Sequence, residues 1–359
     1  MSAKGGGNAT GSRLGAERAV VLSGRILITG GAGFIGSHLA QRLKAEGHSL
    51  ILVDDLSTGR RCNVETLLDD RCGLIEAKAA DALRKHPNLL DGVTQVYHLA
   101  AAVGVKLITD DPGAMIHNNV EQTRAVLDAA RRVGVPVLLT SSSEVYGKCP
   151  VLPLHEQMDL VYGPTTASRW SYGLSKAIDE HLAIDYHRKY GLPTVIVRLF
   201  NTIGARQVGH YGMVVPRFIA RAVANEMIEV YGDGKQTRTF CDVRDVTAAM
   251  VKLMANPSRE QRVFNLGSTT QVTIEALADK VIELADSSSG KRFIPYEHVY
   301  GKGFEDPPHR LPDISQIESA IGFRQTIPLE QTLRDLIELH RRERCATGTD
   351  AVSAGSVAS

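Results

Sequence analysis

The chain has 359 residues, with 41 basic and 40 acidic side chains and a formal net charge of +1. This balance leaves no basic surface for nucleic acid or for an anionic membrane, and the apolar runs are too short to span a bilayer. Five scattered cysteines without a CxxC pair indicate reduced thiols rather than disulfides or a zinc site. No apolar core follows the first basic residues, so no secretory signal is expected. We expect a soluble cytoplasmic protein without a metal.

Both ends of the chain are rich in Gly, Ala and Ser, and we expect residues 1–22 and 346–359 to be disordered tails. Between them, short β-branched runs alternate with helical stretches. This alternation predicts an α/β fold with a doubly wound parallel sheet. We expect a first domain at 23–200. A smaller α/β substrate lobe follows at 201–345, with some chain exchange back to the first domain.

The predicted elements follow the apolar pattern in chain order. Buried strands are predicted at 25–29, 50–54, 96–100, 137–141 and 194–198. Helices are predicted at 34–46, 112–133 and 168–190. The last two are long enough to be crossover helices between parallel strands. After about residue 200 the alternation loosens, and glycine and proline become more frequent.

A glycine-rich turn, TGGAGFIG, joins the first strand to the first helix. Three glycines at this spacing allow a tight turn, a close approach of the backbone to a pyrophosphate, and close helix–strand packing. The start of the helix then offers free N–H groups to phosphate. The turn therefore predicts a dinucleotide site. Its predicted contacts are Gly30, Gly33, Phe34, Ile35 and Gly36.

The second strand ends in Asp54, where a carboxylate can accept a hydrogen bond from a ribose 2′-hydroxyl. The same carboxylate would repel a 2′-phosphate, which favours NAD over NADP. Arg60 and Arg61 nearby weaken this preference a little. We therefore expect NAD as the cofactor and a Rossmann domain at 23–200.

Tyr172 and Lys176 are four residues apart, so their side chains share one face of a helix. A neighbouring ammonium and a cationic nicotinamide would lower the pKa of the phenol and make it a usable acid–base group. Ser142, after the strand at 137–141, can hydrogen-bond the same substrate hydroxyl. The Y-x-x-x-K spacing alone is common in helices, and its place on the predicted crossover helix makes it more specific.

These motifs together resemble the extended short-chain dehydrogenase/reductases, a family of nucleotide-sugar epimerases, dehydratases and decarboxylases. The resemblance runs from about Arg25 to about Arg341 and includes HLAA, RLFNTIG and YGDGKQTRTFCDVRD. It implies further cofactor contacts at Asp81, Leu99 and Asn119, beside Tyr172 and Lys176. It implies that the diphosphate and base of a UDP-sugar are held by Asn201, Arg206, Tyr231 and Arg238. It also implies a homodimer through a four-helix interface formed by 112–133 and 168–190.

Glu144 and Arg310 discriminate between the reactions of this family. A small residue is usual at the Glu144 position in 4-epimerases, and 4,6-dehydratases have an Asp–Glu pair there. The pair here is Ser143–Glu144, and Arg310 lies in HRLPD. This combination, together with Arg169, resembles the UDP-glucuronic acid decarboxylases, both the UDP-xylose synthases and the decarboxylase domain of the bacterial aminoarabinose pathway. The phrase YGKGFED at 300–306 is most similar to the second type.

The resemblance implies NAD-dependent decarboxylation of UDP-glucuronic acid. Oxidation at C4 makes a ketone β to the C6 carboxylate, which then leaves as CO2. Arg310 and Ser143 would stabilise the resulting enolate, and Glu144 would order a proton donor or water. Return of the hydride gives UDP-xylose, whereas early loss of NADH gives the UDP-4-keto-pentose.

Several alternatives stay open at this stage. A 4-epimerase of the UDP-glucuronate or UDP-glucose type would keep the carboxylate. A non-catalytic NAD-binding sensor is compatible with the fold, although it has no need of the Ser–Tyr–Lys set. Arg310 can also pair with Asp306 or Asp313 at the surface, and Glu144 can be a strand-end carboxylate bonded to backbone.

Overall fold

The computed structural model describes residues 24–102, 111–209, 213–258, 262–301 and 305–346. The predicted tails lie outside these residues, except that Ala346 ends the last helix. None of the described helices combines the length and apolarity needed to cross a bilayer.

Seven parallel strands form the large sheet, in the order β11-β6-β5-β4-β1-β2-β3. The strands are β1 (Arg25–Thr29), β2 (Ser49–Asp54), β3 (Cys72–Glu76), β4 (Val93–His98), β5 (Val137–Ser142), β6 (Thr194–Leu199) and β11 (Val263–Leu266). The strand order reverses where β1 meets β4. In doubly wound folds such a reversal opens a crevice at the carboxyl ends of the strands, where ligands bind.

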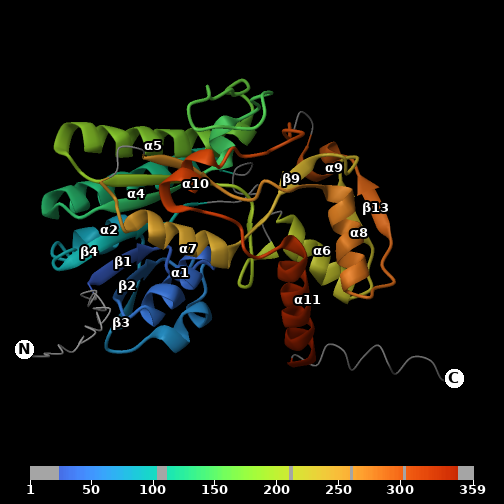
Figure 1. Cartoon of the computed structure of the whole chain (residues 1–359), viewed down its shortest axis with the longest axis horizontal. Coiled ribbons are helices and arrows are strands. Elements are labelled where there is room, and N and C mark those ends of the chain that lie inside the picture. Colours follow the sequence, from blue (N-terminus) through green and yellow to red (C-terminus); the bar gives the residue numbers. More distant parts are fainter. Residues whose placement is uncertain (1–23, 103–110, 210–212, 259–261, 302–304, 347–359) are drawn as a thin grey trace, which may run out of the picture.

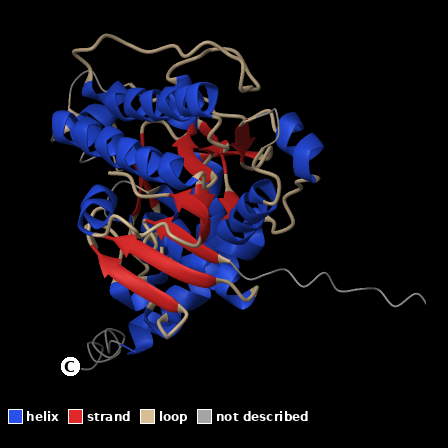
Figure 2. Cartoon of the chain, turned by 90° about the vertical axis from the view of Figure 1, so that its left-hand side faces the viewer, coloured by secondary structure: helices blue, strands red, loops and turns tan. Residues whose placement is uncertain are grey.

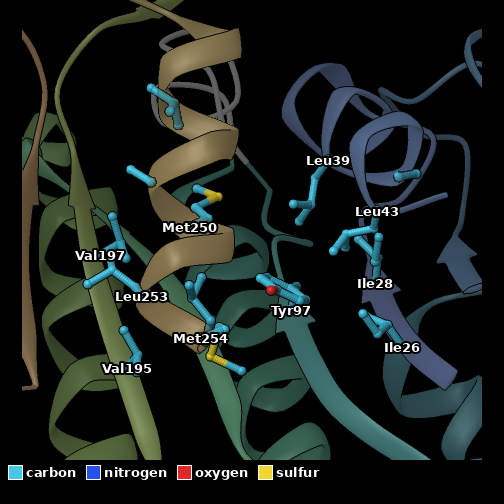
Figure 3. Packing of buried hydrophobic residues seen from close by; sticks show 14 of the residues in the cluster. Ile26, Ile28, Leu39, Leu43, Tyr97, Val195, Val197, Met250, Leu253 and Met254 are labelled. Carbon is cyan, nitrogen blue, oxygen red and sulfur yellow. The ribbon is translucent and has the colours of Figure 1, made fainter. Parts of the chain in front are cut away.

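Helices cover both faces of this sheet, so the predicted doubly wound α/β class is confirmed (Figure 2). One face is covered by α1 (Phe34–Ala45), α7 (Val243–Met254) and α10 (Ser315–Ile321). The other is covered by α2 (Ala79–Lys85), α4 (Pro112–Val133) and α5 (Ser171–Tyr190). Figure 3 shows the first face, where Met250 and Leu253 of α7 lie between Val197 of β6 and Tyr97 of β4. Removing this apolar surface from water stabilises the contact between the sheet and the helices.

Local chemistry explains the boundaries of the crossover helices. At the start of α4 the Asp111 carboxylate accepts a hydrogen bond from the backbone of Ala114, and Pro112 occupies the first turn. Gly134 and Gly191 end α4 and α5 with positive φ angles of 73° and 68°. The helix predicted at 112–133 is thus confirmed. The one predicted at 168–190 begins as the 3₁₀ turn η4 (Ser168–Trp170) before α5.

The predicted strands recur with small shifts. The strand expected at 96–100 is β4 at Val93–His98, because its pairing with β1 ends at His98 opposite Thr29 and the chain then turns into the ligand-binding edge. The sequence analysis does not predict β3, in which only Cys72 is buried and two of the five residues are exposed. Further 3₁₀ turns are η1 (Arg61–Asn63), η2 (Glu65–Leu67) and η3 (Ser143–Tyr146).

A second hydrophobic cluster forms the smaller lobe, to the right of the large sheet in Figure 1. Its helices are α6 (Val214–Val223), α8 (Ile274–Leu284), α9 (Tyr296–Tyr300) and α11 (Leu329–Ala346). The short strands are β7 (Thr202–Ile203), β8 (Ile228–Tyr231), β9 (Thr237–Thr239), β10 (Cys241–Asp242), β12 (Gln271–Thr273) and β13 (Lys291–Ile294). Between these elements the chain returns to the first body, where β11 pairs with β6 and α7 packs on α1. Residues after 200 are therefore divided between the two bodies.

Candidate active site

A cavity of about 790 Å³ lies between the large sheet and the smaller lobe. The carboxyl ends of β1, β2, β4 and β5 form one wall, and side chains of the lobe form the other. The cavity thus sits at the reversal of strand order, where this fold class binds ligands.

The glycine-rich turn is shaped for a group that needs close contact with backbone. A Cβ atom on Gly36 would lie 2.0 Å from the carbonyl oxygen of Gly30, and Gly30 itself has a φ of +70°. No acidic residue stands in the first turn of α1, so nothing there competes with an anion for the free N–H groups. All five predicted contacts of this turn line the cavity: Gly30, Gly33, Phe34, Ile35 and Gly36. The residues present therefore fit the pyrophosphate of a dinucleotide.

Asp54 lines the cavity at the end of β2. Its carboxylate accepts hydrogen bonds of 2.9 Å from the backbone N–H groups of Ala32 and Leu56. Burial raises the pKa of this carboxyl, and the two N–H donors act in the opposite direction. Arg60 and Arg61 are absent from the cavity wall, and Arg61 pairs with Glu76 instead. The carboxylate is thus held in place at the end of β2, beside the glycine-rich turn.

Of the three cofactor contacts that the resemblance implies at Asp81, Leu99 and Asn119, only Leu99 lines the cavity. Asp81 points to solvent in the first turn of α2 and pairs with Arg84 at 2.7 Å. Lys78, just before α2, lines the cavity wall instead. Asn119 is buried behind the wall, where its side-chain oxygen accepts a 2.7 Å hydrogen bond from the backbone of Ala102. Asn119 therefore shapes the wall without facing the cavity.

The proton-transfer set is only partly assembled as predicted. Ser142 and Tyr172 line the cavity, and a hydrogen bond joins their side chains. Lys176 is buried outside the wall, with its ammonium 2.8 Å from the Asp179 carboxylate. Burial and the charges of Glu144 and Asp179 hold the pKa of Tyr172 above its usual range, and Ser142 lowers it. The lowering of this pKa therefore comes from Ser142 and not from Lys176, whose ammonium is paired with Asp179.

Glu144 lies between two arginines at the wall of the cavity. Its carboxylate accepts 2.6 Å and 3.1 Å bonds from Arg169 and a 2.6 Å bond from Arg310. Burial alone would raise the pKa of Glu144, but the charges of Arg310 and Arg169 outweigh it and hold this pKa well below its usual range. The glutamate is therefore an ionised acceptor at neutral pH. It is bound to guanidinium groups rather than to backbone.

Arg310 is only 6% exposed and lines the cavity, so the alternative of a surface pair with Asp306 or Asp313 does not hold. One terminal nitrogen of Arg310, Nη1, binds Glu144. The other, Nη2, is buried and has no hydrogen-bond partner within the part of the chain that the structure describes. Arg310 thus has a donor left for a ligand, and Ser143 lines the cavity as well.

The wall formed by the smaller lobe and the segments leading into it contains most of the predicted nucleotide contacts. Asn201, Tyr231 and Arg238 line the cavity there, whereas Arg206 does not. Arg206 instead donates a 2.9 Å hydrogen bond to the Gln41 side chain of α1, outside the cavity wall. Sequence reasoning missed other lining residues of the lobe: Arg217, Gln236, Tyr296, Tyr300 and Asp306.

Two of the missed residues, Arg217 and Asp306, are charged and contact predicted nucleotide-binding residues. The Arg217 guanidinium lies 3.6 Å from the centre of the Tyr231 ring. The Asp306 carboxylate accepts bonds of 2.6 Å from Arg238 and 3.1 Å from the Tyr296 hydroxyl. Asp306 lies in the YGKGFED phrase, which the resemblance had singled out. Arg217 carried no motif and becomes visible only when α6 packs beside Tyr231.

Comparison with known proteins agrees with this geometry. The model of the NAD dependent epimerase/dehydratase family matches residues 26–267. The chain is 38% identical over 318 residues to a UDP-N-acetyl-alpha-D-glucosaminuronate decarboxylase of Bacillus cytotoxicus, which covers 88% of this chain and 98% of the relative. It is also 38% identical over 317 residues to UDP-glucuronic acid decarboxylase 1 of Arabidopsis thaliana, covering 87% of this chain and 69% of the relative.

Solved structures show the same architecture. UDP-glucuronic acid 4-epimerase of Bacillus cereus, in complex with UDP-glucuronic acid and NAD, aligns with a TM-score of 0.75 and 25% identity over 89% of this chain and 99% of that chain. UDP-glucose 4-epimerase of Thermotoga maritima aligns with a TM-score of 0.78 and 27% identity over the same shares. From the family model, the relatives and the cavity at the strand reversal, we conclude that this chain belongs to the NAD dependent epimerase/dehydratase family.

Proposed function

We propose that the protein is an NAD-dependent decarboxylase of UDP-glucuronic acid or a close analogue of that sugar nucleotide. The observation that carries this proposal is the cluster of Glu144, Arg169 and Arg310 beside Ser142 and Tyr172 in one cavity. Ser142 and Tyr172 can serve the oxidation of a sugar hydroxyl by NAD. The two arginines of the cluster can bind and neutralise a carboxylate. Decarboxylases among the relatives, at 34–38% identity, support the same activity.

The glycine-rich turn and Asp54 are proposed to hold NAD, which supplies a hydride acceptor and donor when bound. Tyr172 is proposed to remove the proton of the C4 hydroxyl, with Ser142 holding the same oxygen. Because the pKa of Tyr172 is above its usual range in the protein alone, the cationic form of the cofactor is the charge expected to bring it down. Tyr172 and Ser142 thus serve the oxidation that precedes loss of the carboxylate.

Arg310 is proposed to act after C4 has been oxidised. A ketone at C4 is β to the C6 carboxylate, so the C5–C6 bond can break with release of CO2 and formation of an enolate. The free Nη2 of Arg310 and the Ser143 hydroxyl are donors for the developing negative charge. Glu144, as an ionised acceptor, keeps Arg310 and Arg169 in position and can hold a water that protonates C5.

The sugar nucleotides for which the relatives are named differ in the substituent at C2 of the sugar. One relative is named for UDP-N-acetylglucosaminuronate and others for UDP-glucuronate. The experiment is to incubate the protein and NAD with each of these two nucleotides, and to follow CO2, product mass and absorbance at the NADH band. Release of CO2 supports the proposal and identifies the substrate. Return of an epimerised sugar acid without CO2 would favour a 4-epimerase, and no turnover of either would leave a sensor.

We further propose a two-fold homodimer through the outer faces of α4 and α5, which lie side by side (Figure 1). Apolar side chains are exposed there, with Val133 at 47%, Ile178 at 43% and Tyr190 at 53%. A monomeric mass at micromolar concentration would count against the dimer. If the dimer is found, Ile178→Glu should weaken it, whereas Phe293→Glu, an equally exposed apolar site in the smaller lobe, should not.

We also propose a cytoplasmic location. All five cysteines are free thiols, of which Cys62 and Cys345 are exposed. Exposed free thiols are typical of a reducing compartment. Labelling of the native protein by a thiol reagent directly after extraction would support this, and disulfide-linked species under the same conditions would contradict it.

A further inference from the structure

Helix α5 contains an ion pair that the proposed reaction does not explain. The Lys176 ammonium lies 2.8 Å from a carboxylate oxygen of Asp179, one turn further along α5. The two side chains are only 2% and 0% exposed. The second carboxylate oxygen of Asp179 is buried and has no hydrogen-bond partner among the described residues. A buried charge pair that leaves one oxygen unsatisfied is costly, so its presence beside the catalytic tyrosine calls for a functional reason.

A second pair on the same helix shows what is unusual. Lys189 and Asp185 are paired at 2.9 Å, but their side chains are 62% and 46% exposed. Such a surface pair contributes little, because water screens both charges. The Lys176–Asp179 pair is shielded from water, and it lies next to Tyr172 instead of at the outer surface. Its electrostatic effect on Tyr172 is therefore much larger than any effect of the outer pair.

We propose that Asp179 is a positioning residue for the oxidation step: its carboxylate holds the Lys176 ammonium and balances its charge, and so limits how strongly Lys176 acts on Tyr172. The inference rests on the proposed function, because it assigns Tyr172 the proton of the C4 hydroxyl. It goes beyond that function in giving a role to a residue outside the cavity wall. It also explains why the predicted activation of the phenol by Lys176 is absent from this arrangement.

Among the described residues, three further groups act on this pair or on Tyr172. Glu144 on η3 is a second negative charge acting on the phenol, and Ser142 at the end of β5 donates a hydrogen bond to it. His98 on β4 also faces Lys176. Burial and the charge of Lys176 lower the pKa of this imidazole to about 3, so it is neutral at physiological pH. Asp179 is therefore the group that balances Lys176, and removing its charge exposes Tyr172 to the full effect of the ammonium.

The decisive variant is Asp179→Asn, which keeps the volume and removes the charge. We expect the acid limb of the pH profile of kcat/KM to move to lower pH by about one unit, since an uncompensated cation nearby favours the phenolate. Asp179→Glu should restore the wild-type profile, and Asp185→Asn should leave it unchanged. The comparison requires that the wild-type protein turns over its substrate. If the acid limb of Asp179→Asn then coincides with that of the wild type, the inference is overturned.

A second measurement needs no turnover. Unfolding equilibria of Asp179→Asn, Lys176→Met and the double variant form a cycle. Each single change leaves a buried group without its partner, so each should raise the unfolding constant at least tenfold, and the double variant should raise it less than the product of the two. If the changes in unfolding free energy of the two single variants simply add in the double variant, the pair is rejected. If Asp179→Asn alone does not fold, the pair is rejected when the double variant does not fold either. If the cycle succeeds while no substrate is turned over, the proposed function fails and the pairing stands.

Discussion

The two ends of the cavity, which we propose to hold the dinucleotide and the sugar, are built in different ways. The dinucleotide end depends on backbone: three glycines and one strand-end carboxylate, all within residues 30–54. The sugar end depends on charged side chains that come from distant parts of the chain. Glu144 and Arg310 are 166 residues apart in sequence and 2.6 Å apart in space.

The geometry of the first end therefore depends on local backbone, and that of the second on the pairing of charged side chains. At the dinucleotide end, N–H groups and the helix dipole are fixed once the strand, turn and helix form. At the sugar end, like charges would repel unless acidic groups separated them. Glu144 and Asp306 supply that separation for Arg169, Arg310 and Arg238. Changes at the sugar end should therefore alter chemistry, and changes at the dinucleotide end should alter cofactor binding.

The largest effect is expected for Tyr172→Phe. Removing the hydroxyl removes the acid–base group for C4 oxidation, so CO2 release should fall by about 10²–10⁴-fold. Binding of NAD, measured by calorimetry, should fall far less than CO2 release, because the glycine-rich turn and Asp54 are untouched. Tyr186→Phe is the matched control: this tyrosine is on the same helix and its hydroxyl bonds Asp128, away from the cavity. Comparable losses in both variants would show that the effect is structural.

Arg310→Ala should follow, with a loss of about 10²–10³-fold in CO2 release, since one preorganised donor to the enolate is removed. Glu144→Gln should impair the same step, because it releases Arg310 and Arg169. Both variants should still bind NAD. Arg334→Ala, which breaks an exposed pair with Glu330, serves as control. If CO2 release survives both changes at the cluster, Glu144 and Arg310 have no part in the mechanism.

Gly36→Ala tests the dinucleotide end. A methyl group there would meet the Gly30 carbonyl oxygen, so the turn must shift, at a cost of about 1–3 kcal/mol in unfolding free energy. Affinity for NAD should fall with it. Gly73→Ala is the control, because a Cβ atom at Gly73 has nothing within 4 Å. Unchanged NAD affinity in Gly36→Ala would remove the turn from cofactor binding.

A smaller effect is expected for Asp54→Asn. Wild type should bind NAD more tightly than NADP, and loss of the charge should narrow that preference about tenfold, or ~1.4 kcal/mol. Asp91→Asn, an exposed carboxylate outside the cavity wall, should leave the preference unchanged. Equal or tighter binding of NADP by the wild type would contradict the assignment of Asp54.

The sequence by itself determined the fold class and the position of the glycine-rich turn beside Asp54. Both depend on local rules: alternation of strands and helices, glycine spacing, and caps such as Asp111 and Gly134. These features act over a few residues, so the order of the chain is enough to recognise them. The family resemblance added most of the side chains at the sugar end, Arg310 among them.

Only the tertiary structure decided which side chains face the cavity and how their charges are paired. Arg206 and Asp81 carry plausible motifs but point elsewhere, and Arg217 lines the wall without a motif. Asp179 is one turn from Lys176, yet its pairing matters only because the packing of α5 on the sheet excludes water from both groups. The orientation and burial of a side chain depend on neighbours from the whole chain, and in a low-dielectric interior these neighbours determine its electrostatics.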